Sequence, residues 1–129
     1  MCRLVSLETN YGSTVRVADI KKDSILNIIE AAHNCASINE IILFGSSLQE
    51  RCHENSDIDI AVVSNVKRSK LFNSKTYRDF TRQIYMHRIG QDYDILQFDS
   101  AKEIEDSKDA VCQDIKRDGK VIYRREQHV

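Results

Sequence analysis

The chain has 129 residues, of which 41% are hydrophobic and 30% charged, and its formal net charge is −1. This composition is that of an ordinary globular protein, and we expect a single domain over 1–129 with a core that needs no disulfide bonds. The nearly balanced charge argues against extended binding to nucleic acid or to an anionic membrane. Because no apolar run approaches the ~20 residues of a transmembrane helix and the start MCRLVSLETN lacks the apolar stretch of a signal peptide, we expect a cytoplasmic protein.

The first 18 residues form an N-terminal extension whose structure the sequence leaves open. RLVSL (3–7) and TVRVA (14–18) are candidates for short strands, with a turn between them at 10–13. From about Ile20 to His33, apolar side chains recur at helical spacing. This pattern predicts a helix with Asp19 as its candidate N-cap.

Three apolar segments predict strands that are neighbours in one sheet. They are IILF (41–44), DIDIAVV (57–63) and YDILQF (93–98). Gly45-Ser46-Ser47 follows the first of them and predicts a turn with a short helix over 48–51.

The remaining segments predict helices and a closing strand around this sheet. A polar loop over 64–69 leads into one long helix over 70–88, one or two helices fill 100–118, and KVIY (120–123) predicts a final strand. The buried side of helix 70–88 is predicted to carry six apolar or aromatic residues: Leu71, Phe72, Tyr77, Phe80, Ile84 and Tyr85. The order of elements predicts an α/β (α+β) fold with a small mixed β-sheet flanked by helices.

Asp57 and Asp59 interrupt the apolar pattern where a predicted strand begins. Residues i and i+2 of a strand point to the same face, so the two carboxylates lie together and repel each other unless something compensates their charge. Carboxylates are good ligands for hard divalent cations, and two such cations about 3.5–4 Å apart can stabilise both the entering and leaving oxygens of a phosphoryl displacement. Asp94, near the start of the third strand, is the candidate for a third carboxylate, with Asp92 as its rival.

Gly45 and Ser46 predict a phosphate-binding turn beside these carboxylates. Glycine lets the backbone approach a phosphate closely, the following helical turn presents free N–H groups, and the serine hydroxyl can donate a further hydrogen bond. The P-loop and dinucleotide-binding glycine motifs are absent from the sequence. The segment after Asp59 continues as a strand and lacks the glycine of an EF-hand. A nucleotide–magnesium site is therefore the favoured interpretation.

The four cysteines do not indicate a structural metal site. None of them forms a C-x-x-C pair: Cys2, Cys35, Cys52 and Cys112 are widely spaced. Zinc sites usually show such local pairs, so we expect free thiols.

The spacing Gly45-Ser46, ten residues, then Asp57-Ile58-Asp59 resembles the G-S-x10-D-x-D signature of the polymerase-β-like nucleotidyltransferase superfamily. Asp94 lies about where that superfamily places its third carboxylate. The tail IKRDGKVIY (115–123) is similar to the closing helix and strand of the minimal nucleotidyltransferase branch. The resemblance covers about residues 20–123 and implies the nucleotidyltransferase fold.

The resemblance also implies roles for individual residues. Asp57, Asp59 and Asp94 would be the catalytic and metal-binding residues for two Mg²⁺ ions, and Asp94 would also accept the proton of the attacking hydroxyl. The nucleotide would be bound by Gly45, Ser46, Ser47 and Arg51. Many minimal members carry an Arg-Gly pair where this chain has Gln49-Glu50, and Arg51 is the candidate to replace the missing positive charge.

Two functions follow from the resemblance. The first is Mg²⁺-dependent transfer of a nucleoside monophosphate, AMP from ATP or its counterpart from another nucleoside triphosphate, to a hydroxyl of a protein partner. In the resembling branch that partner is often a HEPN-domain toxin, whose tyrosine is modified, and the chain would then be an antitoxin. The alternative is a non-catalytic nucleotide-binding or antitoxin-like module that acts by association with its partner.

Overall fold

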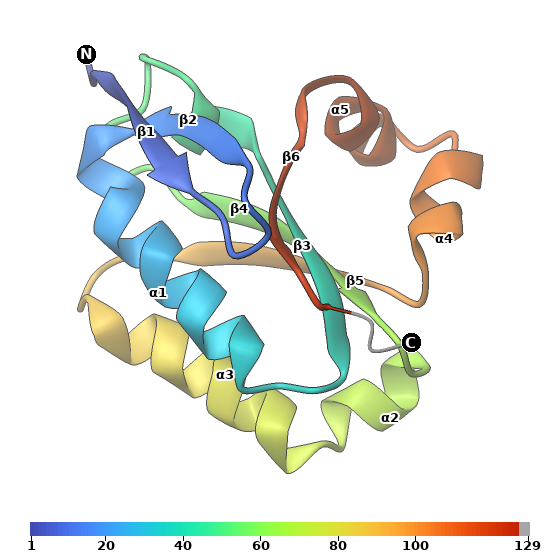
Figure 1. Ribbon diagram of the computed structural model, residues 1–129. Helices are drawn as coiled ribbons and strands as arrows, with labels where there is room; N and C mark the ends of the chain where they lie inside the picture. The colour runs from blue at the N-terminus through green and yellow to red at the C-terminus, as the bar shows by residue number, and fades with distance from the viewer. Residues whose placement is uncertain (127–129) are drawn as a thin grey trace.

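The computed structural model describes residues 1–126 and is built around a four-stranded sheet (Figure 1). The strands of the described chain are β1 (Leu4–Glu8), β2 (Thr14–Ala18), β3 (Ile38–Phe44), β4 (Ile58–Ser64), β5 (Tyr93–Phe98) and β6 (Lys120–Arg124). The α-helices are α1 (Lys22–His33), α2 (Arg68–Phe72), α3 (Lys75–His87), α4 (Ala101–Asp106) and α5 (Ala110–Asp118), with short 3-10 helices η1 (Asp19–Lys21) and η2 (Gly45–Leu48). The expected small mixed sheet flanked by helices is confirmed.

The central sheet has the strand order β5-β4-β3-β6. β3 is antiparallel to both β4 and β6, whereas β4 and β5 are parallel. The three strands that the sequence predicts as neighbours are therefore adjacent. Because β4 and β5 run in the same direction, both begin at the same end of the sheet, and this end carries the predicted aspartates.

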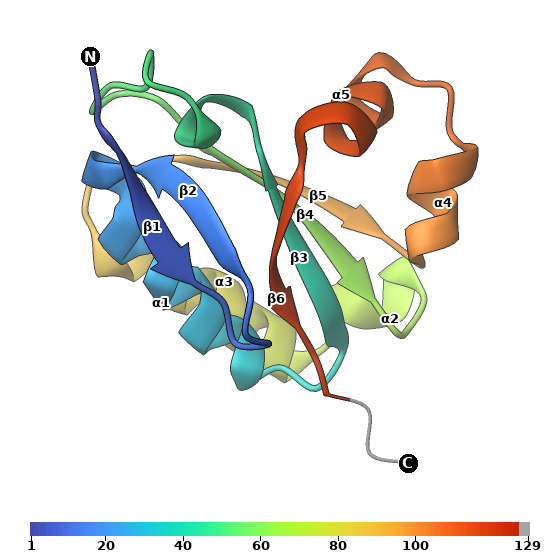
Figure 2. The same ribbon diagram turned by 45° about the horizontal axis from the view of Figure 1, so that its top comes forward.

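Helices cover both faces of the sheet, with α1 and α3 on one side and α4 and α5 on the other (Figures 1 and 2). Alternate residues of β4 divide between the two apolar clusters: Ile58, Ile60 and Val62 pack in the cluster with α1 and α3. Ala61 and Val63 pack in the cluster with α4 and α5. By the same alternation, Asp59 belongs to the α4–α5 face, at its uncovered end.

The N-terminal extension is a β-hairpin of antiparallel β1 and β2. Its buried side chains Leu7, Val15 and Val17 join the cluster formed with α1. The two candidate strands of the sequence are thus present. No helix of the described residues is both long enough and apolar enough to cross a membrane.

The predicted long helix over 70–88 is wrong, because the chain forms two helices with a break at Asn73-Ser74. Ser74 is the N-cap of α3, and its hydroxyl accepts a hydrogen bond from the amide of Tyr77 at 3.4 Å. A serine that bonds to the backbone in this way favours a new helix start over a helix interior. The predicted burial of Phe72 and Tyr85 is also wrong: these side chains are 50% and 45% exposed.

Two further boundaries differ from the prediction. Asp19 is not the N-cap of α1; it opens η1, where its carboxylate accepts a hydrogen bond from the Ile20 amide, and α1 begins at Lys22. The short helix expected over 48–51 lies earlier, at Gly45–Leu48. Both shifts arise because a tight 3-10 turn precedes or replaces the expected α-helical start.

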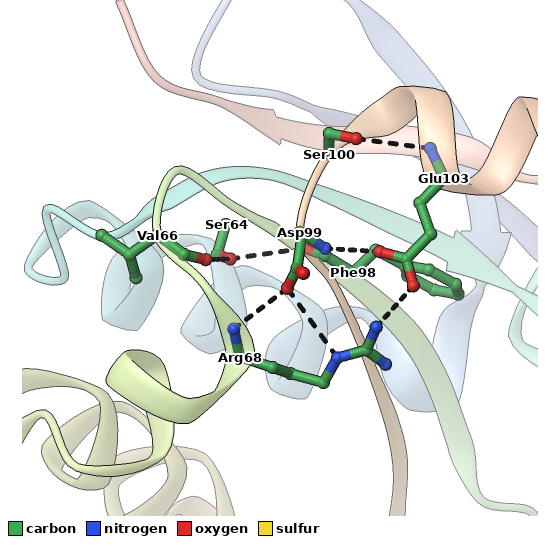
Figure 3. Close-up of polar contacts among 7 residues, drawn as sticks. All are labelled: Ser64, Val66, Arg68, Phe98, Asp99, Ser100 and Glu103. Carbon is green, nitrogen blue, oxygen red and sulfur yellow. Dashed lines mark hydrogen bonds and ion pairs between the residues drawn. The ribbon is translucent and has the colours of Figure 1, made fainter.

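The end of β4 and β5 opposite the aspartates is fixed by a polar cluster (Figure 3). The guanidinium group of Arg68 pairs with the carboxylate of Glu103 at 2.5 Å. The backbone amide of Arg68 donates a hydrogen bond to the carboxylate of Asp99 at 3.0 Å. Ser100 caps α4 by accepting from the Glu103 amide, and the Ser64 hydroxyl lies within 3.3 Å of the Phe98 carbonyl. These contacts connect α2, α4 and the two parallel strands at the end opposite the aspartates.

Candidate functional site

The starts of β4 and β5 bring Asp59 and Asp94 side by side. The two residues are register partners in the parallel pair, and Asp59 is also opposite Phe44, the last residue of β3. Register partners in a sheet point to the same face. Phe44, Asp59 and Asp94 therefore form a row across three strands. The row lies on the face of the sheet against which α4 and α5 pack.

Gly45 follows Phe44, and its backbone closely approaches the side chain of Asp59. Its φ of +76° lies in the left-handed region that favours glycine. A β-carbon at this position would fall less than 3.0 Å from the carboxylate oxygen of Asp59 and 3.1 Å from its Cγ. Both the turn conformation and the space beside Asp59 therefore require glycine.

A cavity of about 330 Å³ opens over these residues. Its strand side is formed by Phe44, Gly45, Asp59 and Asp94. A larger cavity of about 520 Å³ adjoins it and shares Gln49, Arg117 and Asp118 in its lining. The candidate site is thus part of a longer depression that continues toward the N-terminal hairpin, which contributes Leu4 and Val15 to the larger cavity.

The carboxylates in this cavity repel one another. Burial, together with the charges of Asp94 and Asp57, raises the pKa of Asp59 from its ordinary value of 3.8 to about 6. A nearby cation would relieve both effects, since it favours the ionised form. The electrostatics of the site therefore favour a positively charged ligand.

The predicted residues differ in how they meet the cavity. Gly45, Arg51, Asp59 and Asp94 line it directly. Asp57 precedes β4, is exposed, and is close enough for its charge to raise the pKa of Asp59.

Ser46 and Ser47 belong to the turn η2 but not to the lining of the cavity. The Ser47 side chain is fully buried, and its hydroxyl has no hydrogen-bond partner among the described residues. Any contact of Ser47 with a nucleotide is therefore left to its backbone amide, one of the first N–H groups of a helical turn.

Two arginines from different segments bring positive charge to the cavity. Arg51 is exposed, and its Nε donates a hydrogen bond to Oε1 of Gln49. The side chains of Gln49 and Arg51 therefore lie together at the cavity. Arg117 comes from the last turn of α5 and pairs with Asp114 at 2.8 Å and Asp118 at 3.0 Å. These hydrogen bonds raise the pKa of Arg117, so it stays charged.

The fit of a metal ion rests on the chemistry of these donors. Carboxylate oxygens are the ligands that Mg²⁺ prefers, and burial together with the charges of Asp94 and Asp57 raises the pKa of Asp59. Within residues 1–126, however, no three His, Cys, Asp or Glu side chains converge closely enough to form a ready cage. Mg²⁺ typically binds through one or two carboxylates plus substrate phosphates, so a nucleotide would supply the remaining ligands.

The sequence did not single out the contribution of α5. Asp114, Arg117 and Asp118 enter the cavity because α5 packs beside β3, and Gly119 makes this possible. A β-carbon at Gly119 would come within 2.8 Å of the Ile42 side chain. The one available signal was the tail IKRDGKVIY, in which a charged helix end is followed by glycine.

Comparison with known proteins places the fold. The sequence model of the family described as "Polymerase beta, Nucleotidyltransferase" matches residues 26–128. A crystal structure of a mutant of the toxin–antitoxin complex MntA-HpeT is similar, with a TM-score of 0.50, 20% identity, and coverage of 81% of this chain and 73% of that chain. A crystal structure of a toxin–antitoxin with AMP-PNP has a TM-score of 0.50, 22% identity and the same coverage. Comparison with curated proteins gives no match.

Proposed function

The chain belongs to the polymerase β nucleotidyltransferase family, and we propose that it transfers a nucleoside monophosphate from a nucleoside triphosphate to a hydroxyl of a protein partner. In this reaction the acceptor oxygen bonds to the α-phosphorus, the bond to the β-phosphate bridging oxygen breaks, and pyrophosphate leaves. The acceptor proton passes to a base. ATP is the proposed donor, and the solved toxin–antitoxin with AMP-PNP supports this choice for a protein of similar fold.

The observation that carries the proposal is the meeting of Gly45, Asp59 and Asp94 at one cavity. These residues come from three neighbouring strand ends: the sheet register pairs Asp59 with Asp94 and with Phe44, the residue before Gly45. A glycine turn beside paired carboxylates is suited to a phosphate chain and its counter-ions, because the backbone can approach closely while the carboxylates hold cations. A structural role alone would not explain carboxylates placed where burial and the charges of Asp94 and Asp57 raise the pKa of Asp59.

Each residue has a proposed task. Gly45 and Ser46 bind the triphosphate, and Asp57, Asp59 and Asp94 hold two Mg²⁺ ions. When bound, these ions supply charge neutralisation on the phosphates and activation of the attacking oxygen. Asp94, which is exposed at the cavity, also accepts the proton of the acceptor hydroxyl.

Arg51 and Arg117 are proposed to bind phosphate oxygens. Arg51 extends into the cavity from the loop after η2, and so provides the positive charge that the Gln49-Glu50 pair lacks. Arg117 is oriented by two carboxylates, which favours a fixed guanidinium over a mobile one. The adjoining 520 Å³ cavity offers space for the part of the substrates beyond the phosphates.

The proposed acceptor is a folded partner protein. The similar solved structures are toxin–antitoxin complexes, and we propose a HEPN-type toxin as partner and an antitoxin role for this chain. A helical HEPN protein encoded beside this chain would supply the first acceptor to test.

A second candidate is a nucleotide-binding module that neutralises its partner by association alone. It is favoured by the lack of a ready three-carboxylate cage among residues 1–126. The two candidates differ in one product, a partner that carries a covalent nucleotide. Incubating chain, partner, Mg²⁺ and ATP and then measuring the intact mass of the partner distinguishes them.

A further inference from the structure

Lys21 is a lysine buried almost completely at the start of α1. Its side chain has 1% exposure, although lysine is almost never buried without partners. The Nζ atom donates to the carbonyl of Ser56 at 2.7 Å, to the carbonyl of Glu54 at 3.0 Å and to Oε1 of Gln91 at 2.5 Å. These three acceptors match the three N–H donors of one ammonium group.

The acceptors of Lys21 belong to the two segments that lead into the aspartate strands. Ser56 immediately precedes Asp57, and Gln91 lies three residues before Asp94. One buried ammonium from the end of η1, just before α1, therefore holds the approach to β4 and the approach to β5 at the same time.

Gln91 completes this connection. Its side chain is 6% exposed, and its Nε2 donates to the carbonyl of Ser56 at 3.1 Å and to the carbonyl of Asp92 at 2.7 Å. The Asp92 carbonyl in turn accepts a hydrogen bond at 3.1 Å from the amide of Ile58, which lies between Asp57 and Asp59. The network thus ends on the backbone that bears the predicted metal ligands.

We propose that Lys21 is a positioning residue, which with Gln91 locks the segment before Asp57 to the segment before Asp94 and so sets the separation of the carboxylates. Its consequence for the reaction rests on the proposed function. The Nζ partners of Lys21 are Ser56, Glu54 and Gln91, none of which lines the cavity over the aspartates, and they include neither Gly45 nor Arg51, the residues proposed to bind phosphate. Lys21 acts through the carbonyls of Ser56 and Glu54 and through the side chain of Gln91.

Two variants and one control test this role. Lys21→Met keeps the length of the side chain and removes all three donors, and Gln91→Met removes one acceptor and both amide donors while it leaves Lys21 in place. Ile28→Val, on the buried side of the following helix α1, loses one buried methylene without touching the network. Urea unfolding of each variant provides the global stability against which local effects are compared.

The first readout is amide hydrogen exchange in the protein without ligands. We expect the Ile58 amide to exchange about tenfold faster in Lys21→Met and Gln91→Met, beyond any change at Ala61 in the middle of β4. The reason is that local opening at Ile58 no longer has to break the hydrogen bonds of the network. Ile28→Val should change both amides in proportion to global stability. Equal changes at Ile58 and Ala61 in the two network variants would make Lys21 a stability residue and overturn the proposal.

The second readout is Mg²⁺–ATP affinity by calorimetry. Loss of a group that orients metal ligands typically costs ten- to a hundredfold in metal affinity, and we expect at least a tenfold loss in Lys21→Met and less than twofold in Ile28→Val. The double variant should lose no more than the stronger single variant, since both act on one network. If wild type itself neither binds Mg²⁺–ATP nor transfers nucleotide while Ile58 behaves as expected, the proposed function fails and the positioning role stands.

Discussion

Gly45 and Asp59 are matched to each other across the β3–β4 pair: the glycine leaves the space that the carboxylate occupies. A side chain at position 45 would meet the Asp59 carboxylate before it met any substrate. The glycine of the proposed phosphate-binding turn is therefore also required by the strand that carries the proposed metal ligands. This relationship connects the two halves of the predicted motif in space.

Replacing Gly45 by alanine should cost more than backbone strain. Gly12 provides the matched control, because its φ is also positive, +85°, and a β-carbon there meets nothing within 4 Å. Gly12→Ala should lose about 1 kcal/mol of unfolding free energy, the cost of a left-handed alanine. Gly45→Ala should lose more than this and also weaken Mg²⁺–ATP binding, as measured by urea unfolding and calorimetry. Equal losses in both variants, with ATP binding unchanged, would contradict the match between Gly45 and Asp59.

Asp59→Asn should stabilise the metal-free protein in a pH-dependent way. The folded-state pKa of Asp59, about 6, lies above its ordinary value of 3.8, so the folded state binds the proton more tightly and wild-type stability falls as pH rises from about 4 to 6. Asparagine carries no charge at any of these pH values. The variant should therefore gain about 1 to 2 kcal/mol over wild type above pH 6.5, after allowance for solvent screening, and nothing below pH 4.

Thermal melts in EDTA across pH 3.5 to 8 measure this difference. Asp57→Asn should leave the fold intact or slightly more stable for the same reason, since its charge contributes to the raised pKa of Asp59. A loss of several degrees in both variants at neutral pH would mean that the aspartates stabilise the fold, contrary to this account.

The sequence predicts the strand-borne part of the site better than the helix-borne part. Asp59 and Asp94 could be found because strand alternation and shared strand direction depend on local pattern. Arg117 and Asp114 could not, since their place at the cavity depends on how α5 packs against the sheet, which no local pattern specifies. The break at Asn73-Ser74 was missed because neither glycine nor proline marks it, although a serine three residues before Tyr77 is a helix-start signal.

Nucleotide binding should require a divalent cation. A triphosphate and the carboxylates near Asp59 repel one another without it. Calorimetry should show that ATP binds in the presence of Mg²⁺ and that its affinity is at least tenfold lower in EDTA. Equal affinity in both buffers would exclude metal-mediated binding at this site.

Asp94→Asn separates proton transfer from nucleotide binding. Asp57, Asp59 and Ser46 remain to hold the metal–triphosphate, so the variant should keep much of the ATP affinity. Transfer should fall by about two orders of magnitude or more, which is the usual effect of losing a positioned base. Asp92→Asn is the matched control, because this neighbouring aspartate is exposed and does not line the cavity. If Asp92→Asn lost transfer and Asp94→Asn retained it, the assignment of the base would be reversed.

Intact mass spectrometry of a candidate HEPN-type partner, after incubation with the chain, ATP and Mg²⁺, detects covalent transfer of a nucleotide to that partner. With wild type we expect the partner to gain the mass of one or more nucleoside monophosphates, and we expect no gain with Asp59→Asn or with EDTA. A partner that is bound and neutralised by wild type, yet gains no mass under any of these conditions, would contradict the enzyme and establish the association module in its place.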